Sequence, residues 1–548
     1  MRGTLDLSSN LLICSEALVH SASEITVAVS GRFFGLSELS NPAALFCEQY
    51  RTKGLAACRE FNFEAVILIH DQKKKLGLLI RDRMGCRQIY YSLEQGVLSF
   101  SENPCDVSIL AGKPALPNLN AVQSFLRYSY LPGTQTFWTG VQSLPAGNCL
   151  ELNLKSLKID KYHTWKAEVF RGSFAEAKKA LLALILDALN LRCGKDLNLL
   201  LSGGIDSSSL AVAGKKLGRN LTAYTITFDE PDYNEIQSAE AVARYLGIKH
   251  EKIHLTFEMF KHWMVKLLSE KAFLLRSQGQ LSFIAALSGR HSSFVNGAGS
   301  DEGLLGYDYQ LSALAKRERQ SRYYSLFPVE MLDNLPRNTI LKDIFNDELQ
   351  EIFDHREYLT PYFNSDELKE MFQKGWTEPE HFWIEWMKPM NSLTDFQYDE
   401  LLPDNQLPRI RGIADAAESE ILVPFADYRF RNFFQSLPDD FRLNGKKSKF
   451  ILHELMRNDL PEQVLTRPKT PLKVPIDRWF EKGRPFFCKM LSEFSASNGV
   501  KIEPQRLFED TRNLGYKGFE KILLLLSGMA CLKNNSAPEI QGAFLNNR

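Results

Sequence analysis

The chain has 548 residues, of which 44% are hydrophobic and 24% are charged, and this length suffices for two or more domains that each bury a core. Lysine plus arginine and aspartate plus glutamate are equal in number, at 66 each. No net electrostatic field therefore draws nucleic acid or an acidic membrane surface, and we expect neither partner.

The nine cysteines are dispersed, with no C-x-x-C pair and no Cys/His cluster at metal-ligand spacing. This usage is typical of reduced thiols, most of them in cores. Asp6 and Glu16 flank the only short apolar run near the start, which argues against a signal peptide. No stretch approaches the roughly 18 continuous apolar residues of a membrane span. We expect a cytoplasmic protein.

The first third of the chain alternates short β-like runs with turns, which predicts a small sheet-rich domain over residues 1–167. A helix-like stretch from Pro42 to Tyr50 lies among these runs. The expected strands are Ile25 to Val29, Glu64 to Ile69, Leu76 to Ile80, Gln88 to Tyr91 and Val97 to Phe100.

A phosphate-binding loop is predicted at Ser202-Gly203-Gly204. Before it, Ser173 and Glu176 have capping-box form and open a helix that ends near Gly194. A short apolar run then leads into Ser-Gly-Gly and a second helix-forming stretch, which predicts a buried strand, a tight loop and a helix N-terminus. Glycines let the backbone approach an anion, and the first helical turn offers free N–H groups. The residues expected to bind nucleotide here are Leu201, Ser202, Gly203, Gly204, Asp206, Ser207 and Ser208.

Further strands and helices alternate downstream, which predicts an α/β domain over residues 172–535 with a doubly wound parallel sheet. The expected elements are strands Ala223 to Phe228, Glu251 to Leu255 and Ser293 to Asn296, and a helix from Ser238 to Leu246. A second glycine-rich loop, Asn296 to Gly303, follows the last of these strands. Each loop taken alone is also compatible with an ordinary glycine-containing turn. Residues 536–548 are expected to form a polar tail.

Two later segments carry candidate catalytic residues. Glu420 precedes the run Val423-Pro424-Phe425, and its simpler interpretation is a solvated carboxylate at a helix end. Lys449 closes a lysine-rich run before an apolar helix, a pattern that usually marks a solvated basic face. Lys469 follows in Arg467-Pro468-Lys469.

The N-terminal part resembles the glutaminase domain of asparagine synthetases. The segments 82–91, 131–137 and 144–147 match its D-R-x-G-x-x-P-L-Y-Y, P-G-x-x-T-x-x and L-P-P-G runs. The nucleophile of that family is an N-terminal cysteine, whereas Arg2 follows Met1 here, and we expect the first strands of the domain to be missing. Without a thiolate there is no route to a glutamyl thioester, so we expect an inactive remnant that does not hydrolyse glutamine.

The later loops resemble ATP pyrophosphatases, through S-G-G-x-D-S, and asparagine synthetases, through G-x-G-S-D-E and L-P-D…E-x-R-V-P-F-L-D. The resemblance implies ATP as substrate and a Mg²⁺ ion shared by Asp206 and Asp301. It also implies that Glu420 handles the amine, directly or through Tyr398, and that Lys449 contacts the α-phosphate. Phe228, Gly299 and Lys469 are the remaining nucleotide contacts that the resemblance suggests. The family's D-R-x-S-M is replaced by residues 411–415, Arg-Gly-Ile-Ala-Asp, which leaves the substrate open.

These patterns predict an ATP-dependent ligase that forms an amide through an acyl-adenylate and releases AMP and pyrophosphate. Relatives without glutaminase activity close rings in β-lactam and lasso-peptide biosynthesis, and we expect such intramolecular closure in antibiotic or other specialised biosynthesis, with a precursor peptide or partner protein as an option. The alternative is an ammonia-dependent asparagine synthetase. A pseudoenzyme and a tRNA-modifying pyrophosphatase are the other classes, and the oligomeric state stays open.

Overall fold

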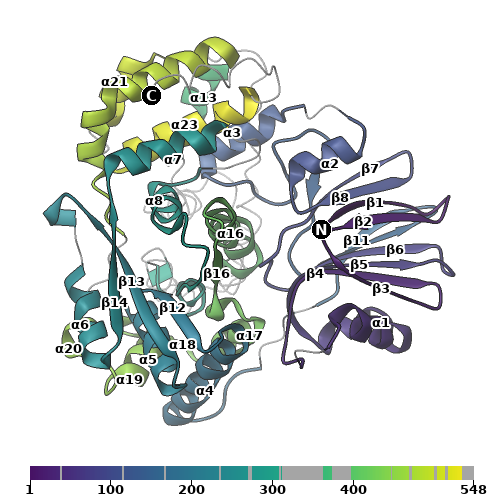
Figure 1. Cartoon of the computed structure of the whole chain (residues 1–548), viewed down its shortest axis with the longest axis horizontal. Coiled ribbons are helices and arrows are strands. Elements are labelled where there is room, and N and C mark those ends of the chain that lie inside the picture. The colour runs from purple at the N-terminus through teal and green to yellow at the C-terminus, as the bar shows by residue number, and fades with distance from the viewer. Residues whose placement is uncertain are drawn as a thin grey trace, which may run out of the picture.

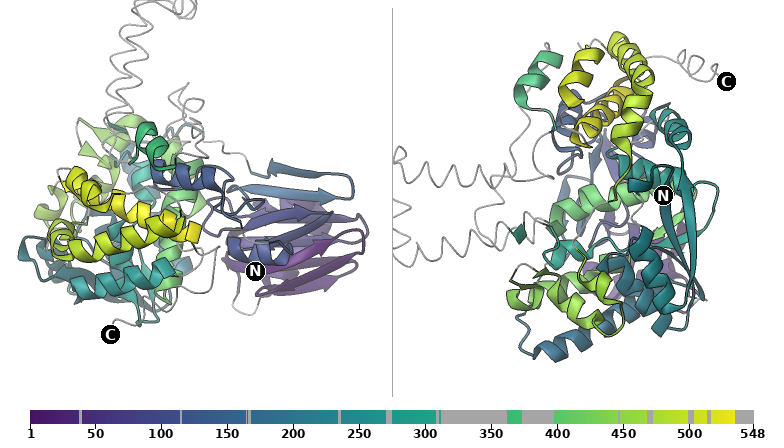
Figure 2. Two further views of the ribbon diagram at one scale, coloured as in Figure 1. Left: turned by 90° about the horizontal axis from the view of Figure 1, so that it is seen from above. Right: turned by 90° about the vertical axis from the view of Figure 1, so that its left-hand side faces the viewer.

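The structure is a computed structural model, and it describes residues 1–37, 40–113, 116–163, 165, 168–233, 236–269, 275–307, 310–311, 362–372, 397–445, 447–467, 472–498, 503–512 and 516–533. Figure 1 shows a sheet-rich N-terminal part beside a larger α/β part. Figure 2 shows the same two parts from above and from the side. Within these ranges, no helix is both long enough and apolar enough to cross a membrane.

The N-terminal part contains two antiparallel sheets, in the strand orders β2-β1-β8-β7-β9 and β11-β10-β6-β5-β4-β3. Its three first strands correct the expectation that the opening strands are missing, because β1 pairs on both sides within the first sheet. The short apolar run from Leu11 to Cys14 is itself part of β2. The strands are β1 (Arg2–Asp6), β2 (Leu11–Ser15), β3 (Leu18–Ala22), β4 (Ile25–Phe34), β5 (Asn62–Asp71), β6 (Leu76–Arg81), β7 (Tyr90–Glu94), β8 (Val97–Ser101), β9 (Gln142–Ser143), β10 (Asn148–Asn153) and β11 (Leu157–Lys161).

Strand β5 explains why this part is so apolar. Side chains alternate across a strand, and here both faces are buried. Val66 and Leu68 belong to the core between the two sheets, together with Leu5 and Phe100. Ala65, Ile67 and Ile69 face a second core under helix α1 (Pro42–Lys53). The continuous run Ala-Val-Ile-Leu-Ile therefore belongs to a strand covered on both sides.

The predicted parallel sheet is present, in the order β14-β13-β12-β15-β16 with every pair parallel. β12 lies at its centre, and the loop after β12 therefore opens at the middle of the sheet. Leu197 and Leu199 of β12 belong to one core cluster and Leu200 to another, so both faces of the sheet are covered by helices. The strands are β12 (Asp196–Leu200), β13 (Asn220–Phe228), β14 (Lys249–Leu255), β15 (Ser293–Val295) and β16 (Glu420–Leu422).

The remaining elements belong to both parts of the chain, and those after Ser173 surround the parallel sheet. Helix α4 begins after Ser173, which forms the expected capping box with Glu176. The other elements are η1 (Gly54–Arg59), α2 (Pro104–Leu110), α3 (Leu119–Tyr128), α4 (Phe174–Arg192), α5 (Ile205–Lys216), η2 (Pro231–Tyr233), α6 (Ile236–Leu246), α7 (Phe257–Ser269), α8 (Gln278–Leu287), α9 (Ser300–Gly303), α13 (Ser365–Phe372), η3 (Gln397–Gln406), α16 (Leu407–Ala416), η4 (Pro424–Ala426), α17 (Tyr428–Ser436), α18 (Asp439–Arg442), β17 (Leu443–Asn444), β18 (Lys447–Ser448), α19 (Phe450–Met456), α20 (Glu462–Leu465), α21 (Ile476–Asn498), α22 (Pro504–Arg512) and α23 (Tyr516–Lys533).

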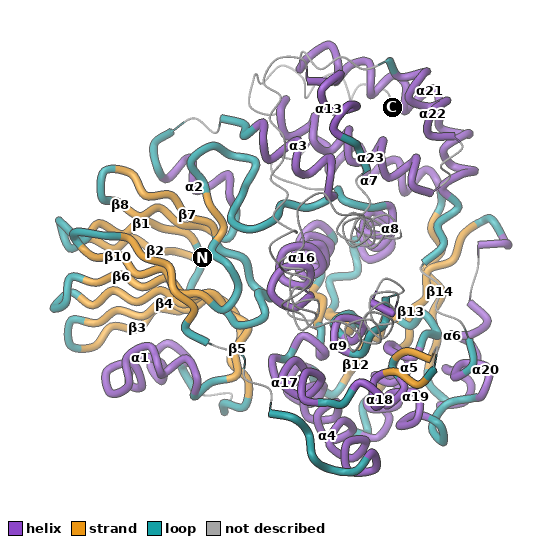
Figure 3. Tube along the Cα trace, turned by 180° about the vertical axis from the view of Figure 1, so that it is seen from behind, coloured by secondary structure: helices purple, strands orange, loops and turns teal. Residues whose placement is uncertain are grey.

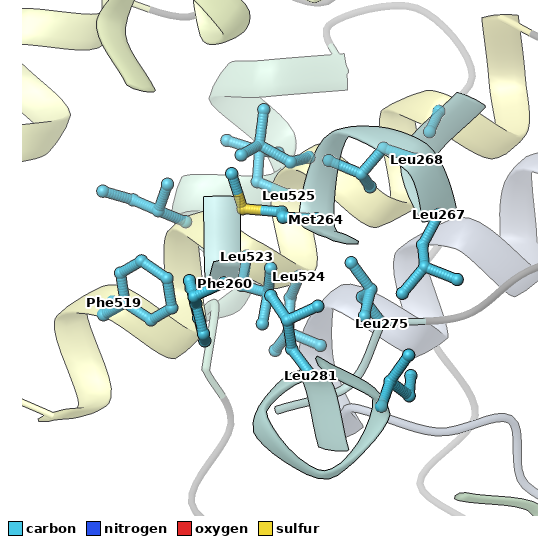
Figure 4. Packing of buried hydrophobic residues seen from close by; sticks show 14 of the residues in the cluster. Phe260, Met264, Leu267, Leu268, Leu275, Leu281, Phe519, Leu523, Leu524 and Leu525 are labelled. Atoms are coloured by element: carbon cyan, nitrogen blue, oxygen red, sulfur yellow. The ribbon is translucent and has the colours of Figure 1, made fainter. Parts of the chain in front are cut away.

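Helices from the end of the chain complete the larger core. Figure 4 shows Phe260 and Met264 of α7 packed near Leu523 and Leu524 of α23, with Leu281 of α8 beside them. Helix α23 also contacts α3, which precedes the parallel sheet by about seventy residues in the chain. The last helices therefore tie the N-terminal part to the α/β part.

A buried ionic network joins the two parts at the base of the sheet. Arg192 of α4 lies 2.6 Å from Glu64 of β5 and 2.9 Å from Asp427. Asp427 also accepts a hydrogen bond of 2.8 Å from Asn62 Nδ2 and one of 2.9 Å from Arg429 Nε. Because burial of an unpaired charge is costly, this network fixes the contact between the two parts.

Candidate functional site

The loop between β12 and α5 is organised by two serine hydroxyls. Ser202 Oγ and Ser207 Oγ lie 3.1 Å apart, and Gly204 N donates to Ser202 Oγ at 3.2 Å. Gly203 has φ +73°, and a Cβ there would lie 2.6 Å from the backbone of Ser238 and Ala239. Helix α5 starts with no side-chain cap. The arrangement leaves a helix N-terminus beside a glycine turn, which suits a phosphate.

Lys449 lies between the two predicted metal ligands. Its Nζ is 2.5 Å from Asp206 Oδ2 and 2.7 Å from Asp301 Oδ1. Asp206 is the second residue of α5 and Asp301 lies in α9, so the loops that follow β12 and β15 meet at this point (Figure 3). The lysine side chain is 4% exposed, whereas the carboxylates are 21% and 19% exposed. The ammonium is therefore buried and both carboxylates reach the surface.

The backbone around Lys449 is shaped to place its ammonium. Lys449 has φ 54°, and its N–H donates to Leu304 O at 3.0 Å. Leu305, next to that acceptor, has φ 57°. Positive φ at a residue other than glycine is strained, and such strain persists where the surroundings fix the conformation. A Cβ at Gly306 would overlap the Asp301 carboxylate and lie 2.6 Å from Lys449 Cε. Only glycine there leaves room for this pair.

The charge state of Lys449 follows from the same contacts. Burial alone would lower the pKa of its ammonium, but the carboxylates of Asp206 and Asp301 overcome that effect and raise the pKa above its usual value. The side chain is thus a permanent cation at neutral pH. Three charges in contact, two negative and one positive, leave a net negative site that attracts a further cation.

The second glycine-rich loop packs directly on the first. A Cβ at Gly297 would lie 3.0 Å from Ser207 N, and a Cβ at Gly299, which has φ +100°, would lie 2.9 Å from the carbonyl carbon of Phe425. At Gly297 the two loops approach backbone to backbone, and at Gly299 the second loop approaches the backbone of η4, so both positions favour glycine. Gly299 thus contributes through its backbone conformation.

Tyr398 does not join the lysine cluster. It lies in η3, it is 1% exposed, and a Cβ at Gly303 of α9 would clash with its hydroxyl. Burial, with the nearby Glu302 carboxylate, raises the pKa of Tyr398 well above its usual value. The Tyr398 side chain packs against Gly303 of α9. A catalytic role for Tyr398 stays a prediction.

Glu420 lies at the other end of its strand from the loops. It begins β16 and aligns with Ser293, the first residue of β15, whereas the glycine-rich loop follows the last residue of β15. Its carboxylate pairs with Arg32 of β4 and accepts a hydrogen bond of 2.7 Å from Ser293 Oγ. The structure therefore does not bring Glu420 to Lys449, and its role with the amine stays a prediction.

Three of the predicted nucleotide contacts are core residues. Leu201 is 1% exposed, Ser208 is 0% exposed and Phe228 is 4% exposed. Phe228 meets the Trp479 ring edge-on at 5.7 Å between centroids. Leu201 follows β12 and Phe228 ends β13, so these two can present backbone rather than side chain to a ligand. Ser208 lies within α5, and its N–H already donates to Gly204 O at 3.0 Å. Lys469 lies outside the described residues.

Two residues at the site had not been singled out from the sequence. Ser300 Oγ donates to Asp206 Oδ1 at 2.5 Å and so fixes that carboxylate. Arg467 Nη1 donates to Ser202 O at 3.1 Å, which brings a second cation to the phosphate loop. The sequence offered one indication of each: Ser300 lies between Gly299 and Asp301, and Arg467 lies two residues before Lys469.

No group of three or more His, Cys, Asp or Glu side chains that could hold a metal occurs among the described residues. Asp206 and Asp301 supply two carboxylates within reach of one cation. Mg²⁺ is commonly bound by one or two carboxylates together with substrate phosphates, and this donor set fits that pattern.

Comparisons with known proteins match both parts of the chain. The family model "Asparagine synthase" matches residues 180–507, and the model "Glutamine amidotransferase domain" matches residues 43–163. Asparagine synthetase [glutamine-hydrolyzing] 1 of Bacillus subtilis is 21% identical over 73% of this chain and 66% of its own length. Asparagine synthetase [glutamine-hydrolyzing] 2 of the same organism is 24% identical over 82% and 62%. The chain thus spans slightly less than two thirds of either relative.

Among solved structures, the NMN synthetase of Francisella tularensis is 17% identical over 38% of this chain and 100% of that chain. Its TM-score is 0.21, a likeness too weak to support a conclusion about the fold. The asparagine synthase model, in contrast, spans more than half of the chain and includes both glycine-rich loops and Lys449. The chain therefore belongs to the asparagine synthase family.

Proposed function

We propose that this protein is an ATP-dependent amide synthetase that releases AMP and pyrophosphate. The observation that carries the proposal is the meeting of Asp206, Asp301 and Lys449 beside the Ser202 to Ser207 loop. A glycine turn, a helix N-terminus and two carboxylates around one buried ammonium suit the triphosphate of a nucleotide. The names of the relatives point to the same class of reaction.

The phosphates of ATP would lie on the first turn of α5. Ser202 and Ser207 present hydroxyls there, and Arg467 lies next to the loop. Asp206 and Asp301 would hold a Mg²⁺, which neutralises charge on the phosphates when it is bound. Ser300 keeps Asp206 oriented for that task.

Lys449 would stabilise negative charge on the α-phosphate while a substrate carboxylate attacks it. The attack forms a bond between the carboxylate oxygen and the α-phosphorus, and it breaks the bond to the leaving pyrophosphate. An amine then attacks the acyl carbon and AMP leaves. Fixed charges in a site with little water stabilise such changes strongly, and burial of Lys449 favours this role.

The amine would not come from glutamine. Burial raises the pKa of the Cys193 thiol to about 11 and that of the Cys58 thiol to about 12, and it raises the pKa of Cys149 further. A protonated thiol is a poor nucleophile, so these cysteines would not form a glutamyl thioester. We therefore favour free ammonia or an amine on the substrate.

Ring closure within one substrate is our preferred form of the reaction, in a specialised biosynthetic pathway of the cytoplasm. The altered segment 411–415 supports a substrate other than aspartate, since it replaces the D-R-x-S-M run of asparagine synthetases. A precursor peptide or a partner biosynthetic protein would supply the acid and amine. Ammonia-dependent asparagine synthesis is the second candidate. The names of the relatives favour asparagine as the product, although they name glutamine as the nitrogen source.

Release of AMP and pyrophosphate from Mg-ATP tests the proposal. Wild type and Asp206→Ala are compared with aspartate plus ammonium, with glutamine, and with cell extract that holds candidate acids or peptides. Release that depends on Asp206 and occurs only with extract, together with loss of one water from an extract component, supports ring closure. Asparagine formation identifies the second candidate instead. Glutamate release from glutamine contradicts the glutamine-independent mechanism.

A further inference from the structure

A cavity lies at the seam between the two parts of the molecule. Its volume is about 300 Å³, within the size range of small-molecule sites. One side is formed by the N-terminal part, including Tyr90, Phe137 and Trp138, and the other by residues before and within α8 and α16. Figure 1 shows α8 and α16 between the parallel sheet and the N-terminal sheets. None of the loop serines, Asp206, Asp301 or Lys449 lines it.

Arg276 is the distinctive charge in this cavity. It is 8% exposed, and its Nη1 donates to the backbone carbonyls of Asp404 at 3.0 Å and Asn405 at 3.3 Å. It forms no ion pair with a carboxylate in the part of the chain that the structure describes. A buried guanidinium has five donors, and these two bonds use one nitrogen. Arg276 therefore keeps donors for an anion in the cavity.

The other charged groups of the cavity are already engaged. Arg81 donates to the carbonyls of Arg87, Leu144, Gly85 and Pro403. Glu102 pairs with Arg87 at 2.7 Å, and Arg411 pairs with Asp415 on its own helix at 2.9 Å.

Asp404 is a carboxylate near Arg276 whose charge depends on pH. Its carboxylate is 3.9 Å from Arg81, and burial raises its pKa to about 7 although Arg81 and Arg276 oppose the shift. Two guanidiniums thus face at most one negative charge, and the local balance is positive.

Aromatic side chains form part of one wall, and the lining also carries unused polar atoms. Phe137 and Trp138 are 2% and 4% exposed, and their rings meet edge-on at 6.2 Å. Trp138 Nε1 and Gln135 Oε1 are buried and have no hydrogen-bond partner among the described residues. Buried polar atoms normally have partners, so these two mark places where a ligand or water completes the bonding.

We propose that this seam cavity binds a small organic carboxylate with an apolar body the size of one aromatic ring. The carboxylate pairs with Arg276, and the ring lies against Tyr90, Phe137 and Trp138. Guanidinium and carboxylate match in a two-bond geometry, and the three aromatic side chains on one wall favour an apolar body beside them. The site is separate from the phosphate loops and does not depend on the proposed amide synthesis.

The test uses 3-phenylpropionate as probe and calorimetric titration of the full-length protein. The matched compound 3-phenylpropanamide has the same body without the charge. We expect saturable binding of the acid and binding of the amide that is about tenfold to a hundredfold weaker, the usual worth of a hydrogen bond to a charged group. Equal affinities, or no saturable binding of the acid, overturn the proposal.

Variants locate the site. Arg276→Gln should lose the preference for acid over amide, and Arg411→Gln should keep it, because Asp415 already neutralises Arg411. Melting curves confirm that each variant is folded, and the comparison of acid with amide on wild type remains decisive if Arg276→Gln does not fold. Unchanged preference in folded Arg276→Gln contradicts the assignment.

Binding by Asp206→Ala separates this inference from the proposed function. That variant should release no pyrophosphate and yet bind the probe as wild type does, because Asp206 does not line the cavity. Loss of probe binding in folded Asp206→Ala would place the probe at the nucleotide site and overturn the separate site.

Discussion

The carboxylates of Asp206 and Asp301 at the end of the parallel sheet contrast with those of Glu400 and Asp404 in η3. The first two share a buried ammonium and reach the surface. The second two are enclosed at the seam, and burial raises the pKa of Glu400 to about 8 and that of Asp404 to about 7. The same functional group is thus paired with a buried cation in one region, whereas in the other region burial favours its protonated form. A site prepared for cations needs both surface access and a compensating charge.

The largest effect on activity is expected from substitution of Lys449, which lies between the carboxylates of Asp206 and Asp301. Lys449→Met removes the ammonium between two carboxylates, and we expect ATP-dependent pyrophosphate release to fall at least about a hundredfold, as for loss of a preorganised charge. Lys447→Met, which removes an exposed lysine two residues away, should retain activity. Full activity in Lys449→Met would remove this residue from the mechanism.

Asp427 tests a carboxylate that is buried and yet fully paired. Loss of its charge in Asp427→Asn leaves Arg192 with Glu64 and Arg429 with Asp187 as their remaining carboxylate partners. The free energy of unfolding in urea should then fall by about 3 kcal/mol, because a buried pair has been broken. Burial would raise the pKa of Asp427, but Arg429 and Arg192 hold it below its usual value, so its stabilisation is present above about pH 4 and is lost as pH falls. Asp160, which forms an exposed ion pair with Lys158, is the control. An equal fall in the free energy of unfolding in Asp160→Asn would contradict a special role for Asp427.

Glu400 tests the second kind of carboxyl group, in which burial favours the protonated form. Its folded pKa of about 8 exceeds the usual 4.5, so its protonation stabilises the fold fully below about pH 4.5, and this contribution is lost as pH rises through 8. Glu400→Gln should therefore match wild type near pH 4.5 and exceed it at pH 9 by on the order of 3 to 5 kcal/mol, since each unit of pKa difference corresponds to about 1.4 kcal/mol. Urea unfolding at the two pH values measures this, with exposed Glu418→Gln as control. A gain that is the same at both pH values would contradict the pKa assignment.

The smallest effect on stability is expected at Glu420. Its ion pair with Arg32 is 38% and 45% exposed, and such pairs contribute about 0 to 1 kcal/mol. Glu420→Gln should thus barely change the urea midpoint. Its effect on pyrophosphate release is the informative measurement, because a loss of more than about tenfold would show that Glu420 acts in catalysis despite its place at the start of β16.

The sequence predicted the phosphate loop, the second glycine-rich loop and the alternation of β12 to β15 with helices, because these features depend on local spacing. Lys449 could be assigned from a motif, whereas the positions of Glu420 and Tyr398 could not. Glu420 depends on the register of β16 against β15, and Tyr398 depends on how η3 packs behind α9.

Other features depend on contacts between distant segments and left no local pattern. Strand β2 lies at a sheet edge with Leu11 and Ile13 exposed. Its sequence therefore lacks the alternation of apolar and polar residues that identifies a half-buried strand. The seam cavity joins residues near 90, 137, 276 and 404, which only the tertiary fold brings together.

The order in which the parallel sheet is assembled affects biosynthesis of the protein. β15 ends at Val295, but its partner β16 begins at Glu420, and Lys449 is 243 residues beyond Asp206. Contacts between segments so far apart form slowly, and a chain emerging from the ribosome holds the edge of β15 unpaired until its partner is synthesised. The proposed nucleotide site is therefore completed late in translation, and a nascent chain that stalls before residue 449 carries both glycine-rich loops without the cation that joins them.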